Sequence, residues 1–203
     1  MKALWVTDRD AIGNETFAAM LETLSGAPDL VVQLREKSAS DREILEWARF
    51  TRQRLGPEVP LLINRRLDVA IAADADGVHL PADGLPLPCV RASAPRGMRV
   101  GISTHSGAEA SRAIAAGADV VVLGPIFATP SKAAFGPPLG PEVLADLPES
   151  GGHEAQVFAI GGIDGDTVGL LGGYRDRIAG VAVVRWLQQS VDPRAVVDRI
   201  GRL

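Results

Sequence analysis

Polar side chains follow two apolar runs in the segment 99–140, at the points where each run ends. They are Ser103 and His105 after the first run, and Thr129, Ser131 and Lys132 after the second. Histidine exchanges protons near neutral pH, and hydroxyl groups beside an ammonium group bind oxyanions. The pattern predicts an enzyme with an anionic substrate and makes His105 a candidate acid or base. A structural histidine and an ordinary polar loop are the competing interpretations.

A second group of polar residues closes an earlier apolar run. Gln33, Arg35 and Lys37 alternate there, which sends all three side chains to one side of a strand. They suit an anion or the edge of a heterocycle, although a solvated, salt-bridged strand end has the same pattern. Asn64 ends the next run, where it either caps the following helix or lines the site.

Two later runs end in residues that favour a phosphate site. Gly161 and Gly162 follow one of them, and paired glycines let backbone N–H groups approach a ligand closely. Val184 and Arg185 end the last run, where Arg185 either adds charge to a phosphate or projects into solvent. We therefore expect Gly161, Gly162, Val184 and Arg185 to bind phosphate.

Short runs of Val, Ile and Leu alternate with amphipathic segments along the whole chain, which is typical of parallel strands covered on both faces. The predicted strands are 4–7, 30–34, 61–63, 77–80, 99–102, 120–123, 157–160 and 180–184. The predicted helices are 15–24, 41–55, 66–73, 108–116, 141–147, 166–171 and 193–200, with a weaker one at 88–95. This order predicts an α/β protein, a single-domain (β/α)8 TIM barrel over residues 1–203.

The barrel explains why the polar residues come after strands, since sites in this fold form at the carboxyl ends of the strands and phosphate often binds after strands seven and eight. An open doubly wound sheet is the competing fold. No glycine-rich turn follows the first predicted strand, where Thr7, Asp8 and Arg9 stand instead, and this argues against a dinucleotide-binding sheet.

Composition and charge exclude several classes of protein. The net charge of −4 argues against nucleic acid or acidic lipid as a partner, and no run approaches the about 20 apolar residues of a membrane span. Cys89 is the single cysteine, and the three histidines lack metal-ligand spacing, so we expect no disulfide and no metal site. The first residues do not form a secretory signal. We expect a cytoplasmic protein that binds a small phosphate-bearing substrate, and the sequence leaves both a monomer and a homo-oligomer open.

Together these segments resemble the thiamine phosphate synthase family, which includes the TenI-like thiazole tautomerases. The matching segments are LWVTD, VVQLREK, LLINRRLDVA, ADGVHLP, VGISTHS, AGADVVVLGPIFATPSK with PLG, FAIGGI and GVAVV, in that order along nearly the whole chain. The resemblance implies a (β/α)8 barrel, in agreement with the pattern of apolar runs.

For a synthase, the resemblance implies that a thiazole phosphate nitrogen attacks the methylene carbon of a hydroxymethylpyrimidine pyrophosphate, and that pyrophosphate leaves. Gln33, Arg35 and Lys37 would then hold the pyrimidine and pyrophosphate. The charge on the departing group would be stabilised by Ser103, Thr129, Ser131 and Lys132. The thiazole phosphate would lie on Gly162 and the backbone of Val184 and Arg185.

Two departures from the synthase pattern favour the other branch. The family's two magnesium-binding aspartates fall on Arg65 and Gly84, with Asp83 one residue early. Tautomerases resemble this chain in lacking those aspartates and in the proline at Pro81, and they use a histidine that aligns with His105. We therefore expect a thiazole tautomerase that needs no cofactor, with His105 as the catalytic acid or base. A synthase, which would need Mg²⁺, is the alternative, and a non-catalytic or regulatory ligand-binding barrel is the second alternative.

Overall fold

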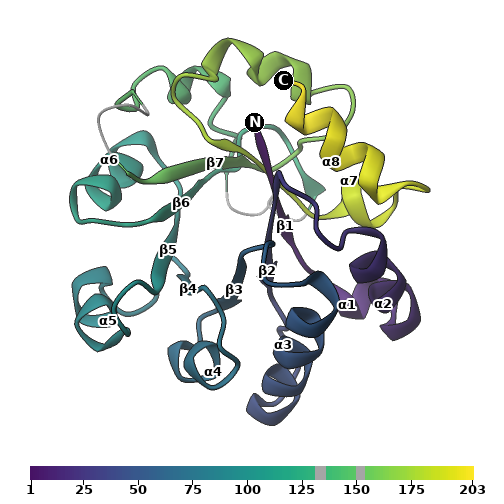
Figure 1. The fold of residues 1–203 in the computed structure, drawn as a ribbon. Coiled ribbons are helices and arrows are strands. Elements are labelled where there is room, and N and C mark those ends of the chain that lie inside the picture. Colours follow the sequence, from purple (N-terminus) through teal and green to yellow (C-terminus); the bar gives the residue numbers. More distant parts are fainter. Residues whose placement is uncertain (131–135, 150–153) are drawn as a thin grey trace.

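The strands of the computed structural model form a closed parallel barrel, as predicted (Figure 1). The structure describes residues 1–130, 136–149 and 154–203. Each strand pairs with the next along the chain, and the eighth closes on the first. The strands are β1 (Lys2–Val6), β2 (Leu30–Leu34), β3 (Leu61–Asn64), β4 (Gly77–Leu80), β5 (Arg99–Thr104), β6 (Val120–Leu123), β7 (Gln156–Ile160) and β8 (Gly180–Val183).

Helices surround the barrel on its outer side (Figure 1). The α-helices are α1 (Arg9–Ile12), α2 (Asn14–Thr23), α3 (Asp41–Leu55), α4 (Leu67–Ala72), α5 (Leu87–Ser93), α6 (Gly107–Ala115), α7 (Arg185–Gln188) and α8 (Pro193–Gly201). The connections after β6 and β7 contain the 3-10 helices η2 (Pro141–Leu144) and η4 (Val168–Tyr174).

The predictions of helices at 141–147 and 166–171 are therefore wrong in helix type, because these segments contain 3-10 helices instead of α-helices. Glycine costs about 1 kcal/mol in an α-helix relative to alanine, and η4 contains Gly169, Gly172 and Gly173. The short helices α1 and α7 were not predicted. Each has four residues, too few for a helical period to show in the sequence.

Alternate residues along each strand face the barrel interior or the helices. The inward residues form a separate apolar cluster: Leu4, Val6, Val31, Leu62, Val120, Val122, Phe158 and Ala182. Gln33 lies two residues after Val31 and shares its inward direction, and Asn64 follows Leu62 in the same way. The fold thus directs the polar residues at the strand ends into the mouth of the barrel.

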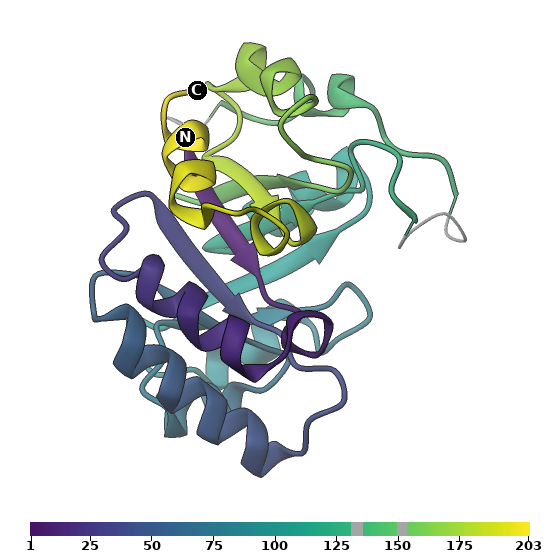
Figure 2. The ribbon, with the colours of Figure 1, turned by 90° about the vertical axis from the view of Figure 1, so that its right-hand side faces the viewer.

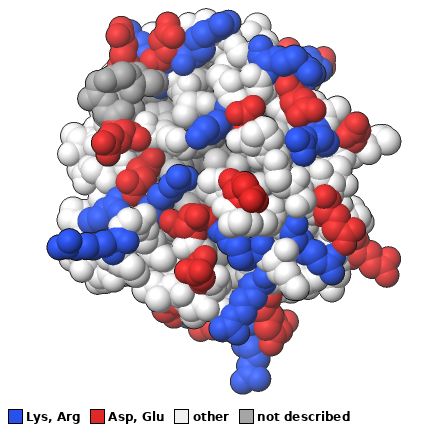
Figure 3. Space-filling model, viewed as in Figure 1, with Lys and Arg blue, Asp and Glu red and all other residues white. Residues whose placement is uncertain are grey.

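The two ends of the chain lie side by side, with α8 beside β1 (Figure 2). The amino group of Met1 donates to the carbonyl of Gly201 at 3.3 Å. On the face viewed in Figure 3, lysines and arginines are interspersed with aspartates and glutamates among the coloured residues. Within the described part of the chain, no helix is both long and apolar enough to cross a membrane.

Candidate active site

Gln33 and Asn64 join the carboxyl ends of β2 and β3. The Gln33 side chain is 4% exposed, and its Nε2 donates to Oδ1 of Asn64 at 3.1 Å. The first turn of α4 has no side-chain cap, so Asn64 lines the barrel mouth rather than capping that helix. The buried Gln33 and the half-buried Asn64 together present donors and acceptors, which is what the edge of a heterocycle requires.

Arg35 is a half-buried cation at the end of β2, and no ion pair or side-chain hydrogen bond to it occurs among the described residues. Burial lowers the pKa of its guanidinium, the nearby Asp8 carboxylate opposes this, and the Arg65 charge lowers it further. The guanidinium groups of Arg35 and Arg65 are therefore close enough to affect each other, and no carboxylate of the described residues is bound to Arg35. Such a site favours a doubly charged anion.

A buried network that was not predicted holds the Arg35 backbone in place. The hydroxyl of Thr7 accepts from the Arg35 N–H at 2.9 Å and donates to Oε1 of Glu36 at 3.2 Å. Oε2 of Glu36 accepts from Nε of Arg9 at 2.9 Å. Burial raises the pKa of the Glu36 carboxyl, and the charge of Arg9 works against this shift.

Replacing Thr7 by valine should lower the free energy of unfolding by about 1–3 kcal/mol, because it leaves the Arg35 N–H and the Glu36 carboxylate with one partner fewer. Urea unfolding at neutral pH measures this difference. Thr23→Val is the control, since the Thr23 hydroxyl is exposed and bonds within its own helix. Equal stability of the two variants would show that the network does not hold β1 and β2 together.

Arg65 stands at the end of β3 with a φ of 66°, in the left-handed region. Its N–H donates to the His79 carbonyl at 2.8 Å, which ties this turn to β4. Its Nη2 lies 3.1 Å from Oδ1 of Asp83, and both side chains are more than half exposed. An exposed pair of this kind contributes at most about 1 kcal/mol, so an anion of higher charge can displace Asp83 from Arg65.

His79 on β4 lies inside the barrel. It is 1% exposed, and its Nε2 is 3.0 Å from Oγ of Ser103 on β5. Burial, and secondarily the charge of Arg35, lowers the pKa of His79 to about 4. The ring is therefore neutral at pH 7, and Arg35, His79 and Ser103 belong to one region of the barrel mouth.

His105 follows β5 and is exposed. Its Nδ1 is 2.7 Å from the carbonyl oxygen of Gly124, and its backbone N–H donates to Oε2 of Glu109 at 2.8 Å. A carbonyl oxygen only accepts, so Nδ1 carries the proton. In the neutral ring this leaves the lone pair on Nε2, which is the arrangement of a general base.

Gly161 and Gly162 lie directly against the loop that follows β6. An added Cβ would be 2.6 Å from the Pro125 Cβ at Gly161 and 2.6 Å from the Ala128 carbonyl oxygen at Gly162. Their φ values are 100° and 64°, a region that side chains disfavour. Close packing thus gives these glycines a structural role, and their phosphate-binding role stays a prediction.

Arg185 joins the end of β8 to the same loop, because its Nη2 donates to Oγ1 of Thr129 at 2.9 Å. Val184, the residue before it, is half-buried and packs against the inward apolar cluster. Lys37 is exposed beyond β2. Ser131 and Lys132, which were predicted to bind the substrate, lie outside the described residues.

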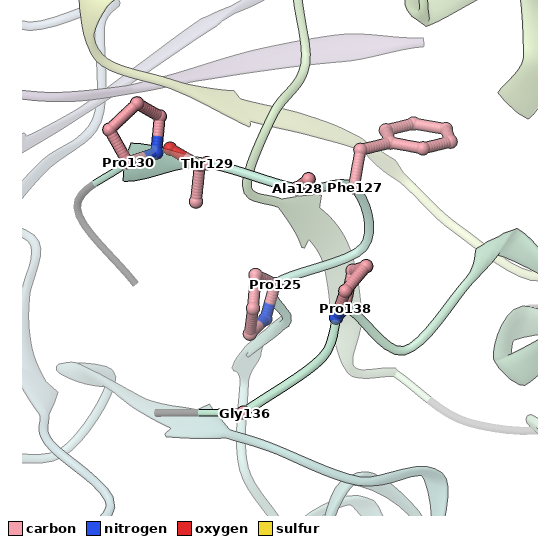
Figure 4. Close-up of a pocket in the computed structure, with 7 residues that line it drawn as sticks. All are labelled: Pro125, Phe127, Ala128, Thr129, Pro130, Gly136 and Pro138. Atoms are coloured by element: carbon pink, nitrogen blue, oxygen red, sulfur yellow. The ribbon is translucent and has the colours of Figure 1, made fainter. Parts of the chain in front are cut away.

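A pocket of about 380 Å³ opens within the loop after β6. Its lining is mainly apolar, and Figure 4 shows Thr129 and Pro130 on one arm of the loop with Gly136 and Pro138 on the other. Thr129 connects this pocket to Arg185. The polar residues at the strand ends thus include one group around Arg35 on β2 to β5 and another around Thr129 on β6 to β8.

Comparisons with known proteins point to a single family. The family model described as Thiamine monophosphate synthase matches residues 3–187. The chain is 38% identical over 204 residues to a thiamine-phosphate synthase of Methanoculleus marisnigri, covering 98% of this chain and 95% of that protein. It is 39% identical over 168 residues to one of Syntrophomonas wolfei, covering 82% and 79%.

Among solved structures, the chain is similar to a thiamine phosphate pyrophosphorylase from Pyrococcus furiosus. The TM-score is 0.81 at 28% sequence identity, and the match covers 99% of this chain and 94% of that one.

Proposed function

This chain belongs to the thiamine monophosphate synthase family, and we propose that it catalyses the synthase reaction, joining a hydroxymethylpyrimidine pyrophosphate to a thiazole phosphate. The relatives carry thiamine-phosphate synthase names. These names support the synthase, which was the alternative in the sequence analysis, better than the tautomerase that it favoured. The synthase and the tautomerase are both enzymes of thiamine biosynthesis, so that conclusion holds for either activity.

The observation that carries this proposal is the half-buried guanidinium of Arg35, which feels the charges of Asp8 and Arg65 and has no ion pair or side-chain hydrogen bond among the described residues. A tautomerase substrate has one phosphate, for which the β6–β8 region would be enough. A synthase binds a pyrophosphate and a phosphate at the same time, and it needs two anion sites. The cationic region on β2 and β3 supplies the second one.

The residues at the family's metal positions do not fit Mg²⁺, which prefers carboxylate and water oxygens. Arg65 brings a positive charge, Gly84 brings no ligand, and Asp83 is bound to Arg65 at 3.1 Å. We infer that the guanidinium groups of Arg65 and Arg35 take over the neutralisation of pyrophosphate, with pyrophosphate displacing Asp83. Arginine suits this role because its planar donors bind two phosphate oxygens at once.

In the proposed reaction, the thiazole nitrogen forms a bond to the pyrimidine methylene carbon while the bond from that carbon to pyrophosphate oxygen breaks. The electron pair leaves with pyrophosphate, and Arg35, Arg65, Lys37 and Ser103 stabilise the growing charge. Gln33 and Asn64 orient the pyrimidine edge. The thiazole phosphate binds Gly161, Gly162 and the backbone of Val184 and Arg185, and Thr129, Ser131 and Lys132 add to the stabilisation of the departing pyrophosphate.

Incubation of the purified protein with both substrates tests the proposal directly. We expect the coupled product and pyrophosphate in equal amounts, measured by chromatography and a phosphate-release assay. Absence of both products would reject the synthase. Binding of thiazole phosphate without turnover of any substrate would then favour the ligand-binding barrel.

A thiazole tautomerase is the second candidate, and the geometry of His105 favours it. The Gly124 carbonyl holds the proton on Nδ1 at 2.7 Å, which leaves Nε2 as a base. A tautomerase needs such a base near neutral pH together with one phosphate site. It needs no metal, which agrees with the residues at the positions of Arg65 and Gly84.

His105→Ala tests the tautomerase candidate. If the protein is a tautomerase, the variant should lose about 10²–10⁴-fold in the rate of thiazole isomerisation, the range that a general base contributes. Binding of thiazole phosphate, measured by calorimetry, should stay within a few fold. His153→Ala is the control, because it removes another histidine by the same substitution. Unchanged isomerisation by His105→Ala would reject His105 as the base.

A further inference from the structure

One edge of the buried His79 ring has a partner and the other has none. Nε2 is 3.0 Å from the Ser103 hydroxyl, whereas Nδ1 is buried and has no hydrogen-bond partner in the described parts of the chain. The register pairs His79 with Gly101 on the neighbouring strand. A Cβ at Gly101 would lie 2.6 Å from Nδ1, so the absence of a side chain there provides the space for this edge of the ring.

This environment decides which nitrogen carries the proton of the neutral ring. In protein interiors, a buried N–H without an acceptor is rarer than a buried acceptor without a donor. A proton on Nδ1 would be such an orphan. The proton therefore belongs on Nε2, where it donates to Oγ of Ser103.

The consequence for Ser103 is that its own hydroxyl proton does not bond to His79. No other hydrogen bond of this hydroxyl occurs among the described residues, and the side chain is half-buried at the barrel mouth. The charge of Arg35 helps to lower the pKa of His79, and His79 contacts Ser103. Arg35 and Ser103 therefore both lie near His79. A hydroxyl that is available to donate, in a region that the Arg35 charge also reaches, suits an oxygen of a phosphate or pyrophosphate.

We propose that His79 is a positioning residue that holds the Ser103 hydroxyl as a hydrogen-bond donor to an anionic phosphate oxygen of the substrate. The inference rests on the proposed function, with pyrophosphate as the group bound. His79 itself touches no reacting atom. Its neutral ring sets the direction of the Ser103 proton.

Nitrogen-15 NMR of the histidine rings tests the proton position without any assay of activity. The sequence has three histidines, and the signal missing from His79→Gln identifies the buried one. We expect a neutral ring at pH 7 with the proton on Nε2. A proton on Nδ1 would overturn the proposal, whatever reaction the protein catalyses.

A double-mutant cycle tests whether His79 acts through Ser103. Calorimetry with inorganic pyrophosphate should show that Ser103→Ala weakens binding by about 10- to 100-fold, the range for a hydrogen bond to a charged group. His79→Leu should weaken it by a similar factor in the native background and hardly at all beside Ser103→Ala. His79→Gln keeps a donor near the Nε2 position and should recover part of the affinity.

Two results of the cycle would contradict the proposal. Losses that multiply in the double variant would show that His79 and Ser103 act independently. Native affinity in Ser103→Ala would show that its hydroxyl does not bind the anion. Failure of the proposed function would look different, because the protein would bind pyrophosphate and give the expected NMR tautomer yet form no coupled product.

Discussion

Arg35→Met is expected to lower kcat/KM for pyrophosphate release by about 10²–10³-fold, or about 3–4 kcal/mol, the typical loss when one group that stabilises developing negative charge is removed. Methionine keeps much of the length of the side chain and removes the charge. Most of the effect should fall on kcat, because the charge on pyrophosphate grows as the bond to carbon breaks. Steady-state kinetics with both substrates measures the change.

Arg54→Met is the matched control, since Arg54 lies on α3 in an ion pair with Glu22 at the surface. Its kinetics should equal those of the native protein. Arg35→Lys should recover part of the loss, because it restores the charge without the planar pair of donors. Equal rates for Arg35→Met and Arg54→Met would show that Arg35 does not stabilise the charge on the departing pyrophosphate.

The buried His79 should make the protein lose stability in mild acid. Its pKa is about 4 in the folded state and near 6.5 when unfolded. As the pH falls below 6.5, the unfolded chain takes up a proton that the folded chain does not bind. The free energy of unfolding should therefore fall by about 3 kcal/mol between pH 6.5 and pH 4 from this group alone.

Urea unfolding across this pH range, on the native protein and on His79→Gln, isolates the contribution. The variant retains the acidic groups, so the difference between the two curves belongs to His79. We expect the free energy of unfolding of the native protein to fall steadily relative to that of His79→Gln below pH 6.5. Parallel curves would mean that the folded state accepts the proton and that the ring is not held neutral.

The fold was predictable because its strands are buried on both faces. Continuous runs such as Val120–Leu123 have few alternatives to a parallel strand, and the structure contains a strand at every predicted position. The crossovers after β6 and β7 were predicted less well. Their glycines and prolines permit compact 3-10 turns, and the sequence alone does not reveal which turn the packing selects.

The site was predictable where a side chain follows a strand in a regular way. Alternation from Val31 directs Gln33 and Arg35 inward, and the buried Gln33 agrees with it. Contacts between distant segments were not predictable, because nothing near Thr7 in the sequence indicates a bond to Glu36. The pairing of Arg65 with Asp83 likewise depends on how two turns meet in space.

We propose that guanidinium groups, rather than a metal ion, neutralise the departing pyrophosphate. The most direct test measures pyrophosphate release by the native protein with added magnesium and again in excess chelator. We predict that release continues in chelator at a similar rate and is lost in Arg35→Met under both conditions. Release that requires magnesium, or no release under either condition, would contradict the claim.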